Sequence, residues 1–211
     1  MTISRSVLSV LMAIIVLFAT LGAGGQVNPA DAWEKRFNDL QPPEKVMEAI
    51  GVKPGMVIGE IGAGRGRYTV HLAGKVGSAG KVYANDIDGG SLAYLRERCQ
   101  RDGIGNVVTI LGRMDDPLFP AGSLDMVFMI NTYHHLARPV VLLRNLIPGL
   151  KSGAIVAVVE HDPDKSGAEF QKESTSQDAL RKQAADAGFE VVRVETFLEK
   201  DNIYILRVKE S

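Results

Sequence analysis

A run of alternating glycines follows a short apolar segment in the first third of the chain. The segment Glu60-Ile61-Gly62-Ala63-Gly64-Arg65-Gly66 places a glycine at every second position, starting two residues after an acidic side chain. Glycine allows a tight turn and lets a ligand approach the backbone closely. The dinucleotide fingerprint needs a glycine where Arg67 stands, and no Gly-Lys-Ser/Thr follows as in a P-loop. The pattern therefore indicates a strand-to-helix turn at a ligand site of another kind.

A second acidic position ends the next apolar segment, in Asn85-Asp86-Ile87-Asp88. A carboxylate at the tip of a second strand can accept hydrogen bonds from both hydroxyls of a ribose. Asp86 lies 24 residues after Gly62, close to the spacing of about 20 in such units. The alternative is a helix cap, and Asp88 is better placed for that role. We therefore assign the ribose contact to Asp86.

Two adjacent histidines follow the apolar run Leu124–Ile130, in Asn131-Thr132-Tyr133-His134-His135-Leu136. Histidine is the side chain best suited to accept a proton near neutral pH, so either residue is a candidate base. The alternative, given equal weight, is that both pack or form hydrogen bonds beneath the loop. Adjacent loop residues rarely face the same way, so we expect at most one of them to reach a substrate.

The remaining cysteine and histidines predict no metal site. Cys99 is the single cysteine and falls on a helical stripe with Leu92 and Leu95, which predicts a core residue. No Cys/His cluster has zinc-ligand spacing. We interpret His71 as a residue on a helix surface and His161 as a loop residue after a strand.

The elements that must position these residues alternate between strands and helices. Ligands in such open α/β sheets bind at the carboxyl ends of the strands. Only a few residues around Lys200 separate the last two strands, which requires a hairpin and makes the final strand antiparallel. The predicted strands are 56–61, 81–86, 107–111, 124–130, 154–159, 189–197 and 202–208, and the predicted helices are 33–50 (interrupted at Pro42-Pro43), 68–76, 91–101, 140–150 and 177–187.

Composition and charge limit the class of protein. The chain has 211 residues, 24 basic and 25 acidic side chains, 45% hydrophobic residues and a net charge of -1. These values are typical of a soluble globular protein and argue against intrinsic disorder or several membrane spans. A near-neutral charge provides no general attraction to nucleic acid. We expect one domain, over residues 26–211.

The N-terminus resembles a targeting segment. Arg5 precedes an apolar run from Val7 to Leu21, which is too short for a bilayer span and matches the apolar region of a signal peptide. Ala23-Gly24-Gly25 then supplies small residues for cleavage before Gln26. We expect residues 1–25 to be a signal peptide or an N-terminal anchor, with membrane association through residues 7–24. The protein would then be exported, periplasmic or membrane-anchored, and cytoplasmic retention stays an open alternative.

Taken together, these motifs resemble the class I S-adenosylmethionine-dependent methyltransferases of bacterial small-molecule type. The glycine run 60–66 matches the family's first motif and Asp86 matches its acidic second-strand end. The segments 119–125 and 150–153, and Ala187-Gly188-Phe189, match the entries into the fourth, fifth and sixth strands. The resemblance implies an α/β Rossmann-like, doubly wound sheet of seven strands in the order 3-2-1-4-5-7-6, with strand 7 antiparallel.

The same resemblance implies the ligand and the residues around it. Glu60 would organise the glycine loop, Gly62, Ala63 and Gly64 would let the backbone pass the methionine and ribose portions of S-adenosylmethionine, Asp86 would hold the ribose, Ile87 would lie against the adenine, and Asn131 would line the methionine side. The family often has an aspartate directly after the glycine that ends strand three. Here Arg113 follows Gly112, so Asp115 is the candidate for the adenine contact. His134 and His135 are the catalytic candidates, and no metal is expected.

Three functions follow from these patterns. The first is methyl transfer from S-adenosylmethionine to a small-molecule acceptor. The second is an exported, non-catalytic binding protein that retains the fold, because the supply of this cofactor outside the cytoplasm is unclear. The third is a nucleotide-linked oxidoreductase, which Arg67 disfavours because glycine is expected at that position.

Overall fold

The computed structural model describes residues 29–167, 172 and 174–209. The chain divides into two units between Arg36 and Phe37, within helix α2 (Pro29–Leu40), and the fold described below belongs to the second unit. The expected signal segment, residues 1–25, lies outside the described residues. Within the described ranges, no helix has the length and apolar character needed to cross a bilayer. The same residues contain no cluster of three or more side chains suited to a metal ion.

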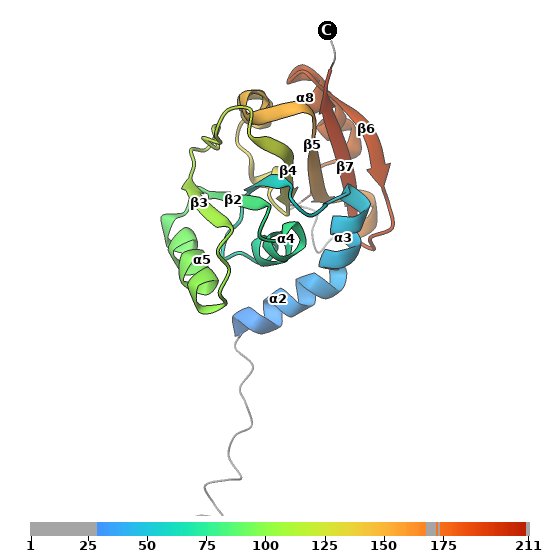
Figure 1. Ribbon diagram of the computed structural model, residues 1–211. Helices are drawn as coiled ribbons and strands as arrows, with labels where there is room; N and C mark the ends of the chain where they lie inside the picture. The colour runs from blue at the N-terminus through green and yellow to red at the C-terminus, as the bar shows by residue number, and fades with distance from the viewer. Residues whose placement is uncertain (1–28, 168–171, 173, 210–211) are drawn as a thin grey trace, which may run out of the picture. The chain divides into compact units, whose positions relative to one another are not determined.

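A single seven-stranded sheet forms the centre of this unit, in the order β3-β2-β1-β4-β5-β7-β6 (Figure 1). Strands β1 to β5 are parallel, and β7 runs antiparallel to both of its neighbours. The predicted order and the antiparallel last strand are both confirmed. The strands are β1 (Val57–Ile61), β2 (Lys81–Asp86), β3 (Val107–Leu111), β4 (Leu124–Ile130), β5 (Leu150–His161), β6 (Phe189–Glu195) and β7 (Asp201–Val208).

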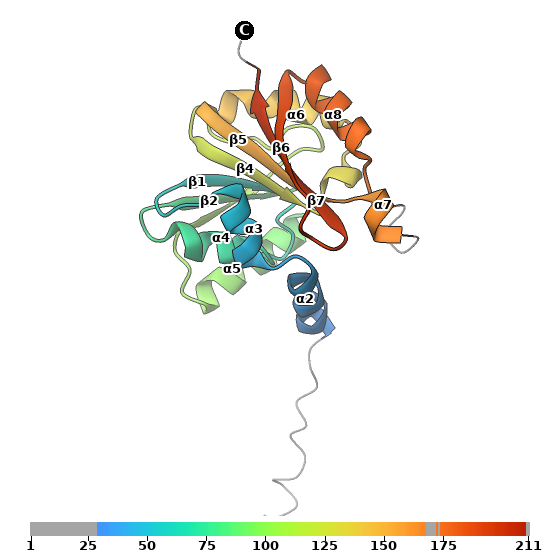
Figure 2. The same ribbon diagram turned by 90° about the vertical axis from the view of Figure 1, so that its right-hand side faces the viewer.

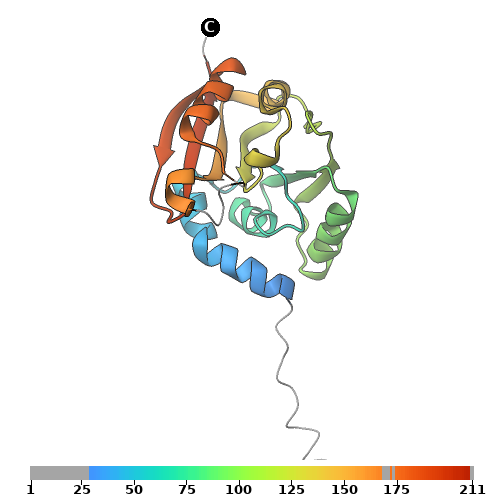
Figure 3. The ribbon, with the colours of Figure 1, turned by 180° about the vertical axis from the view of Figure 1, so that it is seen from behind.

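Helices cover both faces of the sheet (Figure 2, Figure 3). Helices α3 (Pro43–Ile50), α4 (Thr69–Val76) and α5 (Gly89–Arg101) pack on one face, and α6 (Pro139–Leu146) and α8 (Gln177–Asp186) on the other. Three short elements complete the unit: η1 (Tyr133–His135), η2 (Ile147–Gly149) and α7 (Pro163–Ser166).

Strand β4 shows why helices must cover both faces of the sheet. Its side chains alternate between the two cores: Met126 and Phe128 pack with α3 and α4, whereas Val127 and Met129 pack with α6 and α8. All four are at most 1% exposed. A parallel strand buried on both faces is expected to be an almost continuous apolar run, as this one is.

Most predicted elements agree with the structure within a few residues. Leu92, Leu95 and Cys99 form the buried side of α5, and the Asp88 side chain caps this helix by accepting hydrogen bonds from the backbone N–H groups of Gly90 and Ser91. Both expectations are confirmed. The short elements η1 and α7 were not expected, because segments of three or four residues carry no periodicity.

The interpretation of His161 as a loop residue was wrong. His161 is the last residue of β5, is 2% exposed and pairs in the ladder with Asp201 of β7. The apolar run ends at Val159, so hydrophobicity alone placed the end of the strand there. Strand β5 continues through Glu160 and His161 because β7 provides hydrogen-bonding partners beside it.

Candidate active site

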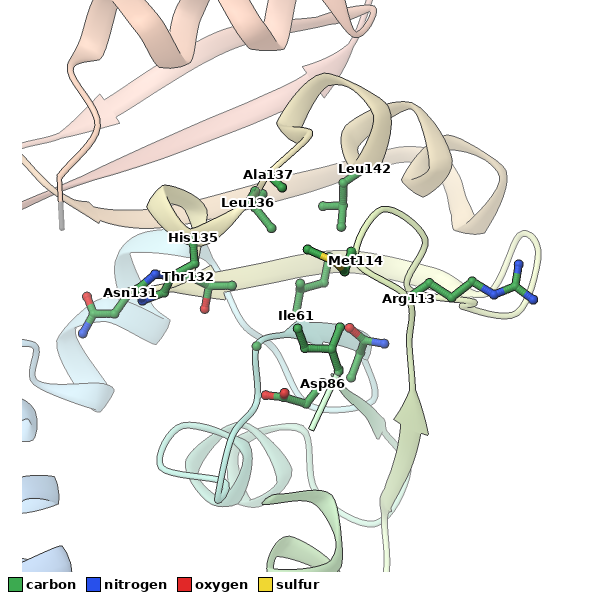
Figure 4. Close-up of a pocket in the computed structure, with 13 residues that line it drawn as sticks. Ile61, Asp86, Arg113, Met114, Asn131, Thr132, His135, Leu136, Ala137 and Leu142 are labelled. Carbon is green, nitrogen blue, oxygen red and sulfur yellow. The ribbon is translucent and has the colours of Figure 1, made fainter. Parts of the chain in front are cut away.

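A cavity of about 350 Å³ opens at the carboxyl ends of β1, β2 and β4 (Figure 4). The lining comes from the ends of these strands, the segment after β3, the segment that includes η1, and helix α6. This is where an open α/β sheet is expected to bind its ligand. The lining residues are Ile61, Gly62, Asn85, Asp86, Ile87, Arg113, Met114, Asn131, Thr132, His135, Leu136, Ala137 and Leu142.

The glycine loop borders this cavity in a conformation that glycine favours. Gly62 and Gly64 have φ angles of +73° and +53°. A β-carbon on Gly62 would lie 2.3 Å from Thr132 Oγ1, whereas one on Gly64 would meet nothing within 4 Å. The alternating glycines therefore serve two needs: a left-handed backbone at both positions, and close approach of the β4 end at Gly62.

Asp86 connects the glycine loop to the end of β2. Its Oδ2 accepts a hydrogen bond of 2.7 Å from the Gly64 N–H, and its Oδ1 accepts one of 2.9 Å from the Asp88 N–H. A carboxylate offers about four acceptor positions. Two of them are therefore left for hydroxyl groups of a ligand in the cavity.

The cavity lining also contains two exposed apolar side chains. Ile87 and Met114 are each 60% exposed, which is unusual for large apolar residues. Ile87 directly follows β2 and Met114 lies three residues after β3, and these two strands are parallel neighbours. Such a pair provides an apolar surface for a flat ring. Met114 was not among the predicted site residues, and its one signal is its place two residues after Gly112.

Asp115, the predicted adenine contact, does not line the cavity. Its carboxylate forms an ion pair with Arg138, and its backbone carbonyl accepts a hydrogen bond of 2.8 Å from Asn145. Arg113 and Met114 from the same segment line the cavity instead. The role of Asp115 stays a prediction.

Glu60 lies behind the glycine loop and is 1% exposed. Its Oε2 accepts a hydrogen bond of 2.5 Å from Thr69 Oγ1, at the start of α4. Burial raises the pKa of this carboxyl from 4.5 to about 7, although the Thr69 hydrogen bond and the Arg67 charge both act to lower the pKa. Glu60 thus connects β1 to the helix after the glycine loop, and its predicted contact near the cofactor's amino group stays untested. Ala63 also lies outside the lining and donates its N–H to the Asn85 carbonyl.

Asn131 lines the cavity and is held by Gln41, a residue 90 positions away. The two side-chain amides form two hydrogen bonds: Gln41 Nε2 donates to Asn131 Oδ1 at 2.7 Å, and Asn131 Nδ2 donates to Gln41 Oε1 at 3.2 Å. Gln41 is fully buried and also contacts Arg67 and Asp201. Asn131 has a φ of +49°, a left-handed conformation that asparagine tolerates better than most residues.

The two predicted catalytic histidines occupy different environments. His135 lines the cavity, whereas the His134 side chain is 5% exposed and does not. His134 Nδ1 lies 2.7 Å from Glu160 Oε1, and its Nε2 lies 3.0 Å from His135 Nε2. The structure thus brings one histidine to the cavity. The catalytic role of either residue stays a prediction.

Glu160 is a buried carboxylate that the sequence analysis missed. It is fully buried at the end of β5, and this burial raises the pKa of its carboxyl, opposed by the neighbouring His134 and His161. A second acid–histidine pair lies beside it, with His161 Nδ1 2.8 Å from Asp201 Oδ1. The signal in the sequence was a charged residue directly after the apolar segment of β5.

The first comparison with known proteins concerns sequence families. Residues 58–153 match the family described as "Methyltransferase domain". Among curated proteins, the chain is 32% identical over 83 residues to the nocamycin O-methyltransferase of Saccharothrix syringae, covering 39% of this chain and 30% of that protein. It is 27% identical over 120 residues to the ubiquinone/menaquinone biosynthesis C-methyltransferase UbiE of Shewanella woodyi, covering 56% and 48%. The matches thus span less than half of either relative.

Among solved structures, a SAM dependent methyltransferase from Aquifex aeolicus is similar to this chain with a TM-score of 0.75 and 28% sequence identity. The match covers 87% of this chain and 100% of that one. The [4+2]-cyclase SpnF is similar with a TM-score of 0.69 at 14% identity, over 82% of this chain and 81% of that one, which concerns the fold alone.

The chain is thus similar to class I S-adenosylmethionine-dependent methyltransferases in its sheet order, in the matched sequence and in its overall structure. The residues that match the family, 58–153, include the glycine loop and every residue of the cavity lining. The cofactor is S-adenosylmethionine, and the residues present fit it. Asp86 has acceptor positions left for ribose hydroxyls, and the exposed side chains of Ile87 and Met114 would provide an apolar surface for the adenine.

Proposed function

We propose that this protein transfers a methyl group from S-adenosylmethionine to a small-molecule acceptor. The main support for this proposal is that one cavity has a lining that combines Gly62, Asp86, Ile87, Asn131 and His135. S-Adenosylmethionine supplies a methyl group on a positively charged sulfur, which is an already activated leaving group. The protein's contribution is therefore to align the acceptor and to exclude water from it.

The residues of the cavity divide this work. The Asp86 carboxylate would hold the ribose, and the Gly62 backbone would leave room for the part of the cofactor that leads to the sulfur. Asn131, which Gln41 fixes by two hydrogen bonds, would orient the methionine end. Each of these groups is held by protein hydrogen bonds or by close packing before a ligand arrives, so little ordering is needed on binding.

The acceptor side of the cavity is apolar. Leu136, Ala137 and Leu142 line it from the segment after η1 and from α6 (Figure 4). The lining favours an acceptor with an apolar body over a highly charged one. The names of the similar curated proteins include an O-methyltransferase and a C-methyltransferase, which supports a small organic acceptor.

Calorimetric titration of the full chain with S-adenosylmethionine and S-adenosylhomocysteine tests the cofactor assignment. Micromolar binding is expected. Asp86→Ala removes a charged acceptor of ribose hydrogen bonds, which costs about 1.5–3 kcal/mol, so affinity should fall about 10- to 100-fold. Asp178→Ala, at an exposed position on α8, is the matched control and should bind as wild type does. Equal affinity of the Asp86 variant would refute the ribose contact, and a folded wild type without binding would refute the function.

The N-terminal segment supports a second proposal, about location. We propose that residues 1–25 direct export or anchor the protein in a membrane, because an apolar run follows Arg5 and small residues precede Gln26. Fractionation of cells, followed by mass spectrometry of the protein's N-terminus, tests it. A product that begins at Gln26, or that sediments with membranes, is expected. A full-length product in the cytoplasm would contradict the proposal.

A further inference from the structure

A chain of three side chains leads from the buried end of β5 to the cavity. Glu160 is fully buried, His134 is nearly so, and His135 lines the cavity. The contacts are 2.7 Å from Glu160 Oε1 to His134 Nδ1 and 3.0 Å from His134 Nε2 to His135 Nε2. Both distances are those of hydrogen bonds. The protonation of one end of this chain therefore depends on the other end.

The chemistry of imidazole sets the direction of the two hydrogen bonds. A neutral imidazole carries a proton on one nitrogen and accepts at the other. When Glu160 is ionised, it accepts from the His134 Nδ1–H, so His134 Nε2 becomes the acceptor for the His135 Nε2–H. His135 then takes up a further proton at Nδ1. When His135 takes up this proton, one proton shifts along each of the two hydrogen bonds. Glu160 then becomes protonated, and both histidines are neutral again.

The surroundings of Glu160 suit a group that holds a proton for part of a reaction cycle. The groups that face Glu160 or His134 are Tyr133 and His135 from η1, His161 from β5 and Tyr204 from β7, and Asp201 of β7 pairs with His161. The His134 and His161 rings are stacked, with 6.3 Å between the ring centroids. Burial raises the pKa of the Glu160 carboxyl, so protonation of this group costs less near neutral pH than it does for an exposed glutamate.

We propose that His135 removes a proton from the acceptor and that Glu160, acting through His134, is the positioning residue that prepares it for this step. This rests on the proposed methyl transfer. The acceptor atom loses its proton to His135 Nδ1, and its electron pair forms the new bond to the methyl carbon. The pair of the broken carbon–sulfur bond stays on the sulfur, which becomes neutral.

The proposal also specifies the class of acceptor. A base is needed when the methylated atom must lose a proton, as for a hydroxyl group, and is superfluous for a tertiary amine or a thioether. A buried carboxylate is costly unless it is paired and hydrogen-bonded. Together with the apolar lining by Leu136, Ala137 and Leu142, the three-residue chain points to an apolar molecule with a hydroxyl group, such as a phenol.

Imidazole ¹⁵N and carboxyl ¹³C NMR of the full chain tests the chain of hydrogen bonds without any acceptor. In wild type, the expected tautomers are Nδ1–H for His134 and Nε2–H for His135. The Glu160 carboxyl and the His135 ring should change together in one step as the pH falls. In Glu160→Gln, the amide can also donate to His134 Nδ1, so both histidines should shift toward the opposite tautomer. Glu190→Gln, at an exposed position on β6, should alter neither.

The proposal would be overturned if Glu160 and His135 titrated separately in wild type, or if the His135 tautomer were the same in Glu160→Gln as in wild type. The wild-type titration keeps the test decisive even where the variant fails to fold. S-Adenosylmethionine binding distinguishes the two claims: Glu160→Gln should bind within about 2-fold of wild type, because Glu160 does not line the cavity. A wild type that does not bind would refute the methyl transfer itself.

Turnover of paired apolar acceptors tests the acceptor class. Each hydroxyl compound, such as 2-naphthol, is compared with its dimethylamino analogue, and released S-adenosylhomocysteine is measured. Methylation of hydroxyl compounds is expected, with kcat about 10- to 100-fold lower in Glu160→Gln and a changed pH profile, at unchanged cofactor affinity. Methylation confined to the dimethylamino compounds, or a variant with wild-type kcat and pH profile, would contradict the proposal.

Discussion

Replacing Gly62 by alanine tests whether the glycine loop is determined by close approach or only by backbone conformation. Gly62 and Gly64 share a left-handed backbone, with φ angles of +73° and +53°. They differ in their surroundings. A β-carbon at Gly62 would lie 2.3 Å from Thr132 Oγ1 and 2.5 Å from its Cγ2, whereas one at Gly64 would meet nothing within 4 Å. Gly64→Ala is therefore a matched control for the backbone cost.

The two substitutions should differ by the cost of the clash. A left-handed backbone costs an L-residue about 1–2 kcal/mol, and this cost applies to both variants. Overpacking at a site that cannot relax adds about 1–3 kcal/mol, and this cost applies to Gly62→Ala alone. The free energy of unfolding should thus fall by about 3 kcal/mol for Gly62→Ala and by about 1.5 kcal/mol for Gly64→Ala.

Urea unfolding of the two variants, and of a double-mutant cycle with Thr132→Ala, measures this difference. Removing the Thr132 hydroxyl and methyl leaves only its Cβ, 3.0 Å from the new β-carbon. In that background, Gly62→Ala should cost about as much as Gly64→Ala, a coupling of about 1–2 kcal/mol. Thr132→Ala alone loses a hydrogen bond to the Ile130 carbonyl and should cost about 1 kcal/mol. Equal costs at Gly62 and Gly64, or no coupling, would refute the close-approach argument.

Two further predictions concern buried charge. The pKa of the Glu60 carboxyl is raised from 4.5 to about 7 by burial, so the folded state holds this proton more tightly and loses about 3 kcal/mol of stability as the pH rises from 4.5 to 7. Glu60→Gln keeps an oxygen acceptor and should remove this loss, which urea unfolding at about pH 5 and pH 8 measures; an unchanged pH dependence would contradict it. Asp201→Ala removes the buried carboxylate that pairs with His161 and one of the two acceptors of the Gln41 amide nitrogen. It should cost about 3–5 kcal/mol in urea unfolding, while the exposed Asp178→Ala should cost less than about 0.5 kcal/mol; equal costs for the two would show that the pair contributes nothing.

The sequence predicted the sheet because its strands carry local signals. Strand β4 is apolar over its whole length, as burial on both faces requires, and β2 and β3 were predicted with the bounds that the structure shows. The antiparallel last strand followed from a geometric limit, since the few residues around Lys200 cannot form a crossover. The strand order came from the resemblance to a known family. None of these inferences required the position of a distant side chain.

The sequence was less informative about the second half of the site. Asp115 was chosen by analogy, whereas its ion pair with Arg138 and the cavity-lining position of Met114 depend on how the segment after β3 folds back. His161 was read as a loop residue because its polarity ends an apolar run, although a ladder with β7 extends the strand through it. Whether a polar side chain can be buried depends on its hydrogen-bonding partners, and a local sequence pattern does not reveal these partners.

The sequence by itself determined the class of fold, the glycine loop and the acidic end of β2, because each depends on residues close together in the chain. Tertiary structure decided which groups meet at the cavity. Gln41 reaches Asn131 across 90 positions, and His134 reaches Glu160 across 26. The second contact forms because the parallel strands β4 and β5 bring their carboxyl ends to one edge of the sheet, and Gln41 reaches the same edge from the connection between α2 and α3. Local periodicity therefore predicts the strands, whereas the hydrogen-bonded pairs at their ends depend on which strands lie side by side in the sheet.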